Sequence, residues 1–369
     1  MTGVQTCALP ISNKKMYYSP NTFQSYGEAE ITYVKEFLEG NSYDDAKIVE
    51  KFEERVSLLF HMKHGILVNS GSSANLLACL ALGIGAQDEI ITPACTFPTT
   101  LSPFIFLGAN VVFCDIEEGH YVPSVEQIMK LVTDKTTAVM IPDLVGDKFD
   151  FDGLKSELIK INRGDIKLIE DACDTVTKSN ADFATISFYA SHVINAGGCG
   201  GMTLTNDDEL ANKCRELRKC GAWDLTCPSY CAAFGLMNSQ KIDYFIECRH
   251  KNLIHYCERL KCIDFYQLPK NTDAVWLSMA LIVKSHRFEI VEELEKLGIQ
   301  TRLCMAGNIL RQPFYAHLFP NVDPEGFPVT EKVFANGILI GLHQGLSDDD
   351  IDWICDKLIE LAKKYSTTD

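Results

Sequence analysis

Three short stretches of the sequence combine residue types that could bind a phosphorylated ligand and move protons. The first is NSGSSANLL, residues 69–77, where an apolar run gives way to a turn at Gly71 and a helix that would begin with Ser72 and Ser73. A helix N-terminus offers unpaired N–H groups and the positive end of the helix dipole, and the two hydroxyls add further donors. This stretch predicts a phosphate cradle, with an ordinary serine-capped helix as the alternative.

The second stretch, LIEDACD, ends a strongly apolar segment in a group of carboxylates between Leu168 and Asp174. Ligands of open α/β sheets bind at the carboxyl ends of the strands. Asp171 could there pair with a protonated ring nitrogen of a cofactor and keep the ring cationic, so that the ring accepts electrons. A loop carboxylate or a helix cap is the structural alternative.

The third stretch, SFYASHVINAGGCGGM, runs from Ser187 to Met202 and follows a strand-like segment with a loop rich in glycine. Glycines let the backbone approach a ligand closely. The hydroxyl of Ser187 would add to a phosphate site, and the imidazole of His192 could take up and return a proton near neutral pH. A histidine with a purely structural role is the alternative for His192.

The elements that must position these residues follow from an alternation of apolar runs and helical patterns. Runs typical of buried strands cover 65–70, 89–94, 111–116, 138–144, 166–171, 184–190 and 201–207. Patterns typical of helices cover 71–83, 100–109, 122–132 and 151–161. This rhythm predicts an α/β fold in which helices cover both faces of a mostly parallel sheet.

The rest of the chain predicts flanking helices and a smaller domain. Helical spacing covers 28–38, 47–60, 208–219 and 241–260, with a break rich in Gly, Pro and Ser over 221–230. Strands near 276–283 and 337–341 and helices near 289–297 and 350–364 suit a smaller α+β C-terminal domain. We predict a large domain over residues 12–235 and a smaller domain over residues 236–369.

Composition and charge restrict the class of partner. The chain has 369 residues, and 50 Asp plus Glu against 34 Lys plus Arg give a net charge of −16. An acidic surface repels phosphate backbones, so we expect neither nucleic acid nor a membrane as partner. No apolar run could span a bilayer and no signal peptide is visible, while the 15 cysteines suit reduced thiols. These features predict a cytoplasmic protein.

The first eleven residues, MTGVQTCALPI, resemble the translation of a short-read sequencing adaptor. Such a segment is excluded from the interpretation of the fold. We predict that deletion of residues 1–11 leaves folding and activity unchanged, and a loss of either would identify the segment as native.

NSGSSANLL, TPACTFPTT, IEDACD and SFYASH with its glycines together resemble the DegT family of sugar aminotransferases and dehydratases, from about residue 28 to about residue 361. These are fold-type-I pyridoxal-phosphate enzymes that act on nucleotide-linked 4-keto-6-deoxy sugars. The resemblance implies a homodimer in which Ser72, Ser73 and Ser187 bind the cofactor phosphate beside the turn at Gly71. It also implies that Phe97 stacks on the cofactor ring and that Asp171 pairs with the ring nitrogen.

His192 stands where the aminotransferases of this family carry the lysine that forms a Schiff base with the cofactor. Imidazole can move protons but cannot form that bond. The chain resembles the 3-dehydratases of the colitose and ascarylose pathways here and in TFPTT and AGNILRQPFY, which implies non-covalent pyridoxamine phosphate or pyridoxal phosphate. The implied reaction removes the C3 hydroxyl of a nucleotide-diphosphate 4-keto-6-deoxyhexose, with His192 as the acid–base group. Glutamate is the implied amine donor.

Two features depart from the family pattern. The ascarylose-type enzyme binds a two-iron cluster through four cysteines, of which only Cys173 has a clear counterpart, because Cys220, Cys227 and Cys231 have a different spacing. Iron–sulfur ligation needs all its thiolates together, so we predict no iron–sulfur cluster and no metal site. The segment 218–232 is also short and lacks the Gly-Tyr-Asn run that crosses to the partner's cofactor phosphate in the family.

The string TRLCMAGNILRQP supplies the candidate substrate residues Arg302, Asn308 and Arg311. Arginine side chains suit the diphosphate of a nucleotide sugar because the guanidinium forms two parallel hydrogen bonds with phosphate oxygens. Surface salt bridges are the alternative for these arginines.

Two other functions fit the sequence. The first is an aminotransferase that acts on the same keto-sugars through another amine, against which His192 itself argues. The second is an inactive homologue that binds its ligand as a regulatory protein. The short segment 218–232 favours the inactive homologue, whereas Asp171, Phe97 and the phosphate-binding serines argue against it.

Overall fold

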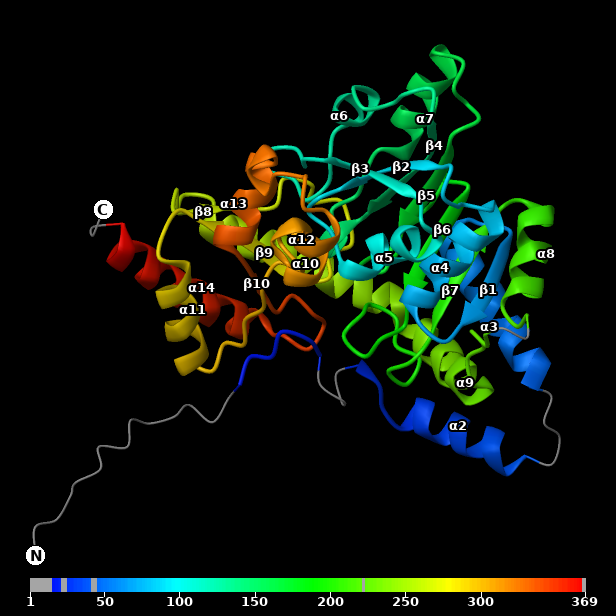
Figure 1. Ribbon diagram of the computed structural model, residues 1–369. Helices are drawn as coiled ribbons and strands as arrows, with labels where there is room; N and C mark the ends of the chain where they lie inside the picture. The colour runs from blue at the N-terminus through cyan, green and yellow to red at the C-terminus, as the bar shows by residue number, and fades with distance from the viewer. Residues whose placement is uncertain (1–14, 21–24, 41–44, 221–222, 367–369) are drawn as a thin grey trace, which may run out of the picture.

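The computed structural model describes residues 15–20, 25–40, 45–220 and 223–366, so the adaptor-like segment lies outside the described residues. Its largest feature is a seven-stranded sheet with the order β1-β7-β6-β5-β4-β2-β3 (Figure 1). The strands are β1 (His64–Val68), β2 (Glu89–Pro93), β3 (Asn110–Cys114), β4 (Thr136–Pro142), β5 (Lys167–Asp171), β6 (Phe183–Ser187) and β7 (Gly201–Thr205). Each strand overlaps one of the predicted apolar runs, so the seven predicted strands are confirmed.

The strands of this sheet run parallel except for β7, which is antiparallel to its neighbours β1 and β6. Asp171 is in register with Pro142 of β4 on one side and with Thr185 of β6 on the other. Parallel strands end at the same edge of a sheet, so the carboxyl ends of β4, β5 and β6 lie at one edge, where β6 continues two residues beyond Thr185. The predicted α/β fold with a mostly parallel, mixed sheet is confirmed.

Helices cover both faces of the sheet (Figure 1). One face carries α4 (Gly71–Leu82), α5 (Pro98–Leu107) and α8 (Asp208–Leu217), and the other carries α3 (Asp45–Phe60), α6 (Val125–Met129) and α7 (Phe151–Lys160). Successive strand side chains point to opposite faces. Ile66 and Val68 of β1 therefore pack in the cluster that includes α4, whereas Leu67 packs in the cluster that includes α3.

Two further helices continue this face: α9 (Ser229–Asn238) packs against α3, and α2 (Glu28–Glu39) packs against α9. The sequence predicted α2 but not α9, because α9 follows a Pro-containing break and is rich in small residues. Its Gly235 lies so close to the ring of Phe52 that an added Cβ would come within 2.4 Å of that ring. The small residues thus let α9 pack closely on α3.

A second sheet with the order β10-β9-β8 is antiparallel. Its strands are β8 (Tyr266–Gln267), β9 (Met279–Val283) and β10 (Gly337–Ile340), and the helices of this region are α10 (Ile242–Leu260), α11 (Arg287–Lys296), α12 (Pro313–Leu318), α13 (Pro328–Asn336) and α14 (Asp348–Tyr365). Short 3-10 turns complete the chain at η1 (Leu144–Gly146), η2 (Ser239–Lys241), η3 (Ile309–Arg311) and η4 (Pro324–Gly326). Met16, near the start of the described chain, forms a β-bridge with Ile299 and packs in the core of this region.

The predicted boundary between residues 235 and 236 falls within α9, and the division into two domains stays a prediction. Within the described residues, every helix is too short or too polar to cross a lipid bilayer.

Candidate active site

A cavity of about 430 Å³ opens at the carboxyl edge of the large sheet. Its walls include Asn69 after β1, Pro142 at the end of β4, Asp171 at the end of β5 and Ser187 at the end of β6. This is the edge at which open α/β sheets bind their ligands. The three stretches with candidate chemistry lie between Asn69 and Met202, which are 133 residues apart. The fold brings residues of all three to this one cavity.

The N-terminus of α4 forms one wall of the cavity. Ser70 caps the helix by accepting a hydrogen bond from the N–H of Ser73 at 3.1 Å, and Gly71 and Ser72 line the cavity. Gly71 packs so closely that an added Cβ would lie 2.8 Å from both Cys173 Sγ and Ser187 Cβ. This close packing brings the helix end, with its dipole, beside the hydroxyl of Ser187, as an anion site requires.

Ser73 is directed away from the cavity, unlike Ser72. Its hydroxyl donates to Asn69 Oδ1 at 2.6 Å and accepts a hydrogen bond from Ser70 Oγ at 3.0 Å. The side chain of Ser73 is not among those that line the cavity. Its hydroxyl orders the turn before α4, and direct phosphate binding by Ser73 stays a prediction.

Asp171 is a buried carboxylate held by three hydrogen bonds. Its Oδ2 accepts from Asn75 Nδ2 at 2.8 Å and from Thr100 Oγ1 at 2.7 Å, and its Oδ1 accepts from the N–H of Cys173 at 3.3 Å. Asn75 is one helical turn after Ser72 on α4, and its Oδ1 in turn accepts a hydrogen bond from Thr185 Oγ1 at 2.5 Å. Such a network fixes the direction of the carboxylate toward the cavity.

Phe97 is the residue before α5, and its side chain lines the cavity with 47% of its surface exposed. An aromatic side chain of this size normally buries most of its surface in a folded protein. The exposed ring therefore offers a flat apolar surface to a ligand in the cavity, which suits the predicted stacking on a cofactor ring.

His192 lines the same cavity from the loop after β6. Its side chain is 15% exposed, and its Nδ1 atom is buried with no hydrogen-bond partner among the described residues. Burial lowers the pKa of His192 to about 4, an effect that the backbone of Cys173 and the charge of Asp171 reduce but do not cancel. The imidazole is therefore neutral at pH 7 and can accept a proton.

Two residues that the sequence did not single out also line the cavity. Burial raises the pKa of the Asp174 carboxyl to about 7, and its Oδ1 lies 3.7 Å from His192 Nδ1. Tyr18 reaches the cavity from the N-terminal segment, and burial raises the pKa of its hydroxyl to about 12. Asp174 could have been found from its place in the acidic cluster, whereas no local signal distinguishes Tyr18.

The candidate substrate residues lie in different environments. Arg302 is exposed and stacks over the ring of Tyr18, with its guanidinium carbon 5.6 Å from the ring centroid. Asn308 is buried, and its amide donates to Glu331 at 2.6 Å and to the carbonyl of Pro324 at 3.2 Å. Arg311 forms an ion pair with Glu331 at 2.7 Å. Only Arg302 thus contacts a residue that lines the cavity, and a substrate role for Asn308 and Arg311 stays a prediction.

The residues of the cavity fit a phosphorylated pyridine cofactor. The N-terminus of α4 with Ser72 and Ser187 suits the phosphate, the fixed carboxylate of Asp171 suits a protonated ring nitrogen, and the exposed face of Phe97 suits the ring. The unpartnered Nδ1 of His192 provides a base in the same cavity. No lysine is among the described residues that line it.

Comparison with known proteins identifies one family of enzymes, in agreement with the resemblance in the sequence. A model of the DegT/DnrJ/EryC1/StrS aminotransferase family matches residues 24–359. The lipopolysaccharide biosynthesis protein RfbH of Salmonella typhimurium is 29% identical, over 84% of this chain and 84% of the relative. The dTDP-4-dehydro-2,6-dideoxy-D-glucose 3-dehydratase of Saccharopolyspora spinosa is 31% identical, over 86% of this chain and 80% of the relative.

Relatives named for a different activity also match. Proteins of Caulobacter vibrioides and Vibrio cholerae named GDP-perosamine synthase are 27% and 28% identical, over 83% and 84% of this chain and 88% and 89% of the relatives. Among solved structures, GDP-4-keto-6-deoxy-D-mannose-3-dehydratase of E. coli with bound hydrated PLP has a TM-score of 0.85 at 24% identity. The match covers 93% of this chain and 99% of that chain, and it shows that the two share a fold.

Proposed function

This chain belongs to the DegT/DnrJ/EryC1/StrS aminotransferase family, whose members are pyridoxal-phosphate-dependent sugar-modifying enzymes, and from that premise we propose that it is a sugar 3-dehydratase. The proposed substrate is a nucleotide-linked 4-keto-6-deoxyhexose, and the proposed cofactor is non-covalent pyridoxamine phosphate. The reaction would serve the synthesis of deoxysugars for a surface polysaccharide. Relatives named 3-dehydratase at 26–31% identity support this assignment.

One observation carries the proposal: the cavity has an imidazole, that of His192, at the position where aminotransferases of the family have a lysine. A neutral imidazole with its Nδ1 free of hydrogen bonds among the described residues can accept a proton but cannot bind the cofactor covalently. These properties match a lyase that removes a hydroxyl with a non-covalently held cofactor, which an amine donor then recharges.

The chain's own residues divide the work of binding. We assign the phosphate to the N-terminus of α4 with Ser72 and Ser187, the ring nitrogen to Asp171 and the ring face to Phe97. When bound, pyridoxamine phosphate supplies the amine that condenses with the C4 ketone and a ring that takes up electrons from the reactive carbon. Asn75 and Thr100 keep the Asp171 carboxylate directed at the ring nitrogen.

Proton transfer belongs to His192 in this proposal. It takes a proton at the cofactor's reactive carbon and returns one to the departing C3 hydroxyl, so a single group serves as base and then as acid. Asp174 is a positioning residue, because its carboxyl lies 3.7 Å from His192 Nδ1 and would stabilise the imidazolium that forms between the two transfers. Arg302 would meet the diphosphate of the substrate beside Tyr18.

The relatives named GDP-perosamine synthase favour one other function, that of an aminotransferase on the same class of sugar. An aminotransferase releases an aminosugar and uses a lysine amine to transfer protons and to hold the cofactor. The inactive homologue predicted as the third possibility would bind the ligand without turnover. The homodimer and glutamate as the amine donor stay predictions from the resemblance.

The test incubates the purified protein with nucleotide 4-keto-6-deoxyhexoses, pyridoxamine phosphate and glutamate, and measures product masses. A 3-deoxy-4-keto sugar with one oxygen atom fewer than the 4-keto substrate supports the dehydratase. Borohydride reduction of the protein with pyridoxal phosphate, followed by peptide mapping, provides the second measurement. A cofactor fixed on a lysine together with an aminosugar product would overturn the proposal, and ligand binding without any product would identify an inactive homologue.

A further inference from the structure

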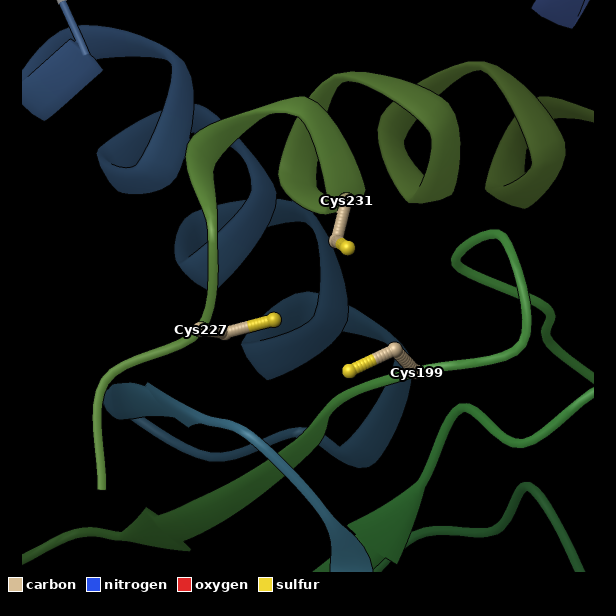
Figure 2. A group of neighbouring side chains, drawn as sticks. All are labelled: Cys199, Cys227 and Cys231. Atoms are coloured by element: carbon tan, nitrogen blue, oxygen red, sulfur yellow. The ribbon is translucent and has the colours of Figure 1, made fainter. Parts of the chain in front are cut away.

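Three cysteines from two distant segments meet beside the cavity. Cys199 belongs to the glycine-rich loop between β6 and β7, Cys227 lies in the segment before α9, and Cys231 lies in the first turn of α9. Their Sγ atoms all lie within 4.8 Å of one another. Figure 2 shows the three side chains directed at a common point between the loop and the start of α9.

The spacing of the sulfur atoms suits a shared metal ion. Zinc binds thiolate sulfur at about 2.3 Å in a tetrahedral arrangement, which places two ligand sulfurs about 3.8 Å apart. Because no two of the Sγ atoms are more than 4.8 Å apart, side-chain rotations that move them by at most about 1 Å would reach that geometry. A disulfide requires about 2.05 Å between two sulfurs and would leave the third cysteine without a partner. A metal ion can bind all three.

The backbone around the cluster is fixed by other contacts. Cys199 Sγ lies 3.4 Å from the carbonyl oxygen of Asn69, and the N–H of Cys231 donates to the carbonyl of Pro228 at 3.0 Å. A Cβ added to Gly200 would come within 3.4 Å of Cys227 Sγ, so the glycine loop and the segment before α9 already pack together. Cys231 is buried, while Cys199 and Cys227 are half-buried. The fold therefore holds the sulfurs near one another, and Cys199 and Cys227 remain partly exposed.

We propose that Cys199, Cys227 and Cys231 form a site for one thiophilic divalent cation, with zinc as the natural occupant. Soft thiolate ligands select such ions over magnesium or calcium. Within the described part of the chain, no fourth histidine, cysteine or carboxylate belongs to the group. Three protein ligands leave the fourth position of a tetrahedral ion to water or to an external ligand.

The ion would connect the active-site cavity to segment 218–232, which is short in this chain. Cys199 lines the active-site cavity, whereas Cys227 and Cys231 lie at the C-terminal end of segment 218–232. A bound ion would fasten the glycine loop to α9 and so fix one wall of the cavity. The proposal replaces the sequence-based expectation of no metal site, and it holds whether or not the enzyme is a dehydratase.

The test uses the full-length protein, reduced with a phosphine and freed of metal with a chelator. Cobalt(II) serves as the probe, because thiolate coordination gives it intense charge-transfer absorption, and zinc then competes for the same site. We expect one cobalt per chain, displacement by one zinc, and a rise in melting temperature with zinc. Cys231→Ser and Cys199→Ser should each weaken zinc binding at least tenfold, whereas Cys262→Ser, at an exposed cysteine outside the cluster, should not change it.

Three outcomes would overturn the site. The first is the absence of stoichiometric cobalt uptake by the reduced wild-type protein. The second is uptake that Cys199→Ser and Cys231→Ser leave unchanged, since the ion would then lie elsewhere. The third is occupation of the cluster by another chemistry, either a disulfide found by peptide mapping of the protein as isolated or iron together with inorganic sulfide. Cobalt uptake and its displacement by zinc are measured first on the folded wild-type protein. These two measurements decide the proposal even if one of the variants does not fold.

Discussion

The Nδ1 atom of His192 lies 3.7 Å from a carboxyl oxygen of Asp174, and both groups are buried against the cavity. Burial lowers the pKa of His192 to about 4 and raises the pKa of Asp174 to about 7. Each group therefore resists its charged form, and both groups are neutral between about pH 4 and about pH 7. A proton that arrives on His192 during turnover would make the ionised form of Asp174 favourable, which is how a positioning carboxylate assists an acid–base histidine.

His192→Asn should abolish most of the proposed dehydration while the cofactor still binds. An amide of similar size keeps the packing but cannot transfer protons, and acid–base help of this kind is worth about 10²–10⁴ in rate. Stopped-flow or steady-state assays of the 3-deoxy product measure the loss, and near-visible absorbance measures pyridoxamine phosphate binding. His250→Asn, at an exposed position on α10, is the control. Full activity of His192→Asn would remove this residue from the mechanism.

Asp174→Asn should change the pH dependence of stability in the ligand-free protein. Because the pKa of Asp174 is about 7 when folded and 3.8 in its ordinary state, the folded chain retains a proton that the unfolded chain has lost between these values. The wild type therefore loses stability as the pH rises through this window, by up to about 1.4 kcal/mol per pH unit from this group. The variant lacks this loss.

Urea unfolding from pH 4 to pH 8 measures the effect as the stability of Asp174→Asn minus that of the wild type. This difference should increase up to pH 7 and then stay level. The exposed carboxylate Asp134, changed to Asn, is the control and should give a flat difference. His192 contributes with the opposite sign between pH 4 and 6.5, because its lowered pKa leaves it unprotonated when folded. A difference that falls with rising pH would contradict the assigned pKa of Asp174.

Much of the fold and part of the site could be predicted because their signals are local. The apolar runs of the large sheet are buried on both faces, so each strand is recognisable in a single segment. Asp171 and Ser187 were also predictable, because Asp171 ends one such run, Ser187 lies in the next, and parallel strands end at one edge. The helix over 122–132 was predicted too long, since α6 ends at Met129, before a run with Thr133 and Asp134 that favours turns.

The rest of the site depends on contacts between distant segments. Tyr18 reaches the cavity because Met16, two residues before it, pairs with Ile299, which lies 283 residues further along the chain, and no periodicity encodes that pairing. Cys199 joins Cys227 and Cys231 only through the packing of a glycine loop on α9, so the spacing of the cysteines along the sequence does not indicate the group. Ser73 has the right residue type next to Ser72, but the turn of the helix directs its hydroxyl to Asn69.

Gly71→Ala should weaken both folding and cofactor binding. The new methyl group would lie 2.8 Å from Cys173 Sγ and from Ser187 Cβ, which forces the N-terminus of α4 away from the phosphate site. Overpacking of this kind costs about 1–3 kcal/mol. Thermal unfolding and pyridoxamine phosphate titration measure the two effects. Gly85→Ala, where an added Cβ meets nothing within 4 Å, should leave both unchanged.

Thr100→Val tests the support of the Asp171 carboxylate. The change removes a 2.7 Å hydrogen bond to Oδ2 and keeps the shape of the side chain. A hydrogen bond to a charged group is worth about 1.5–3 kcal/mol, so cofactor affinity should fall roughly tenfold or more. Thr92→Val is a matched control, because the buried hydroxyl of Thr92 has no hydrogen-bond partner among the described residues. Equal affinities of both variants would show that Asp171 does not depend on Thr100 for its position.

Arg302→Met and Arg311→Met separate the two candidate substrate arginines. Arg302 is exposed and stacks on Tyr18 at the cavity, whereas the guanidinium of Arg311 is paired with Glu331 at 2.7 Å. Loss of a charge that meets the nucleotide diphosphate weakens substrate binding, so Arg302→Met should raise KM about tenfold with little change in kcat. Arg311→Met should leave KM within about twofold, because its charge is already neutralised. A large rise in KM for Arg311→Met alone would mean that the substrate displaces Glu331 from Arg311. Arg311, and not Arg302, would then be the residue that binds the diphosphate.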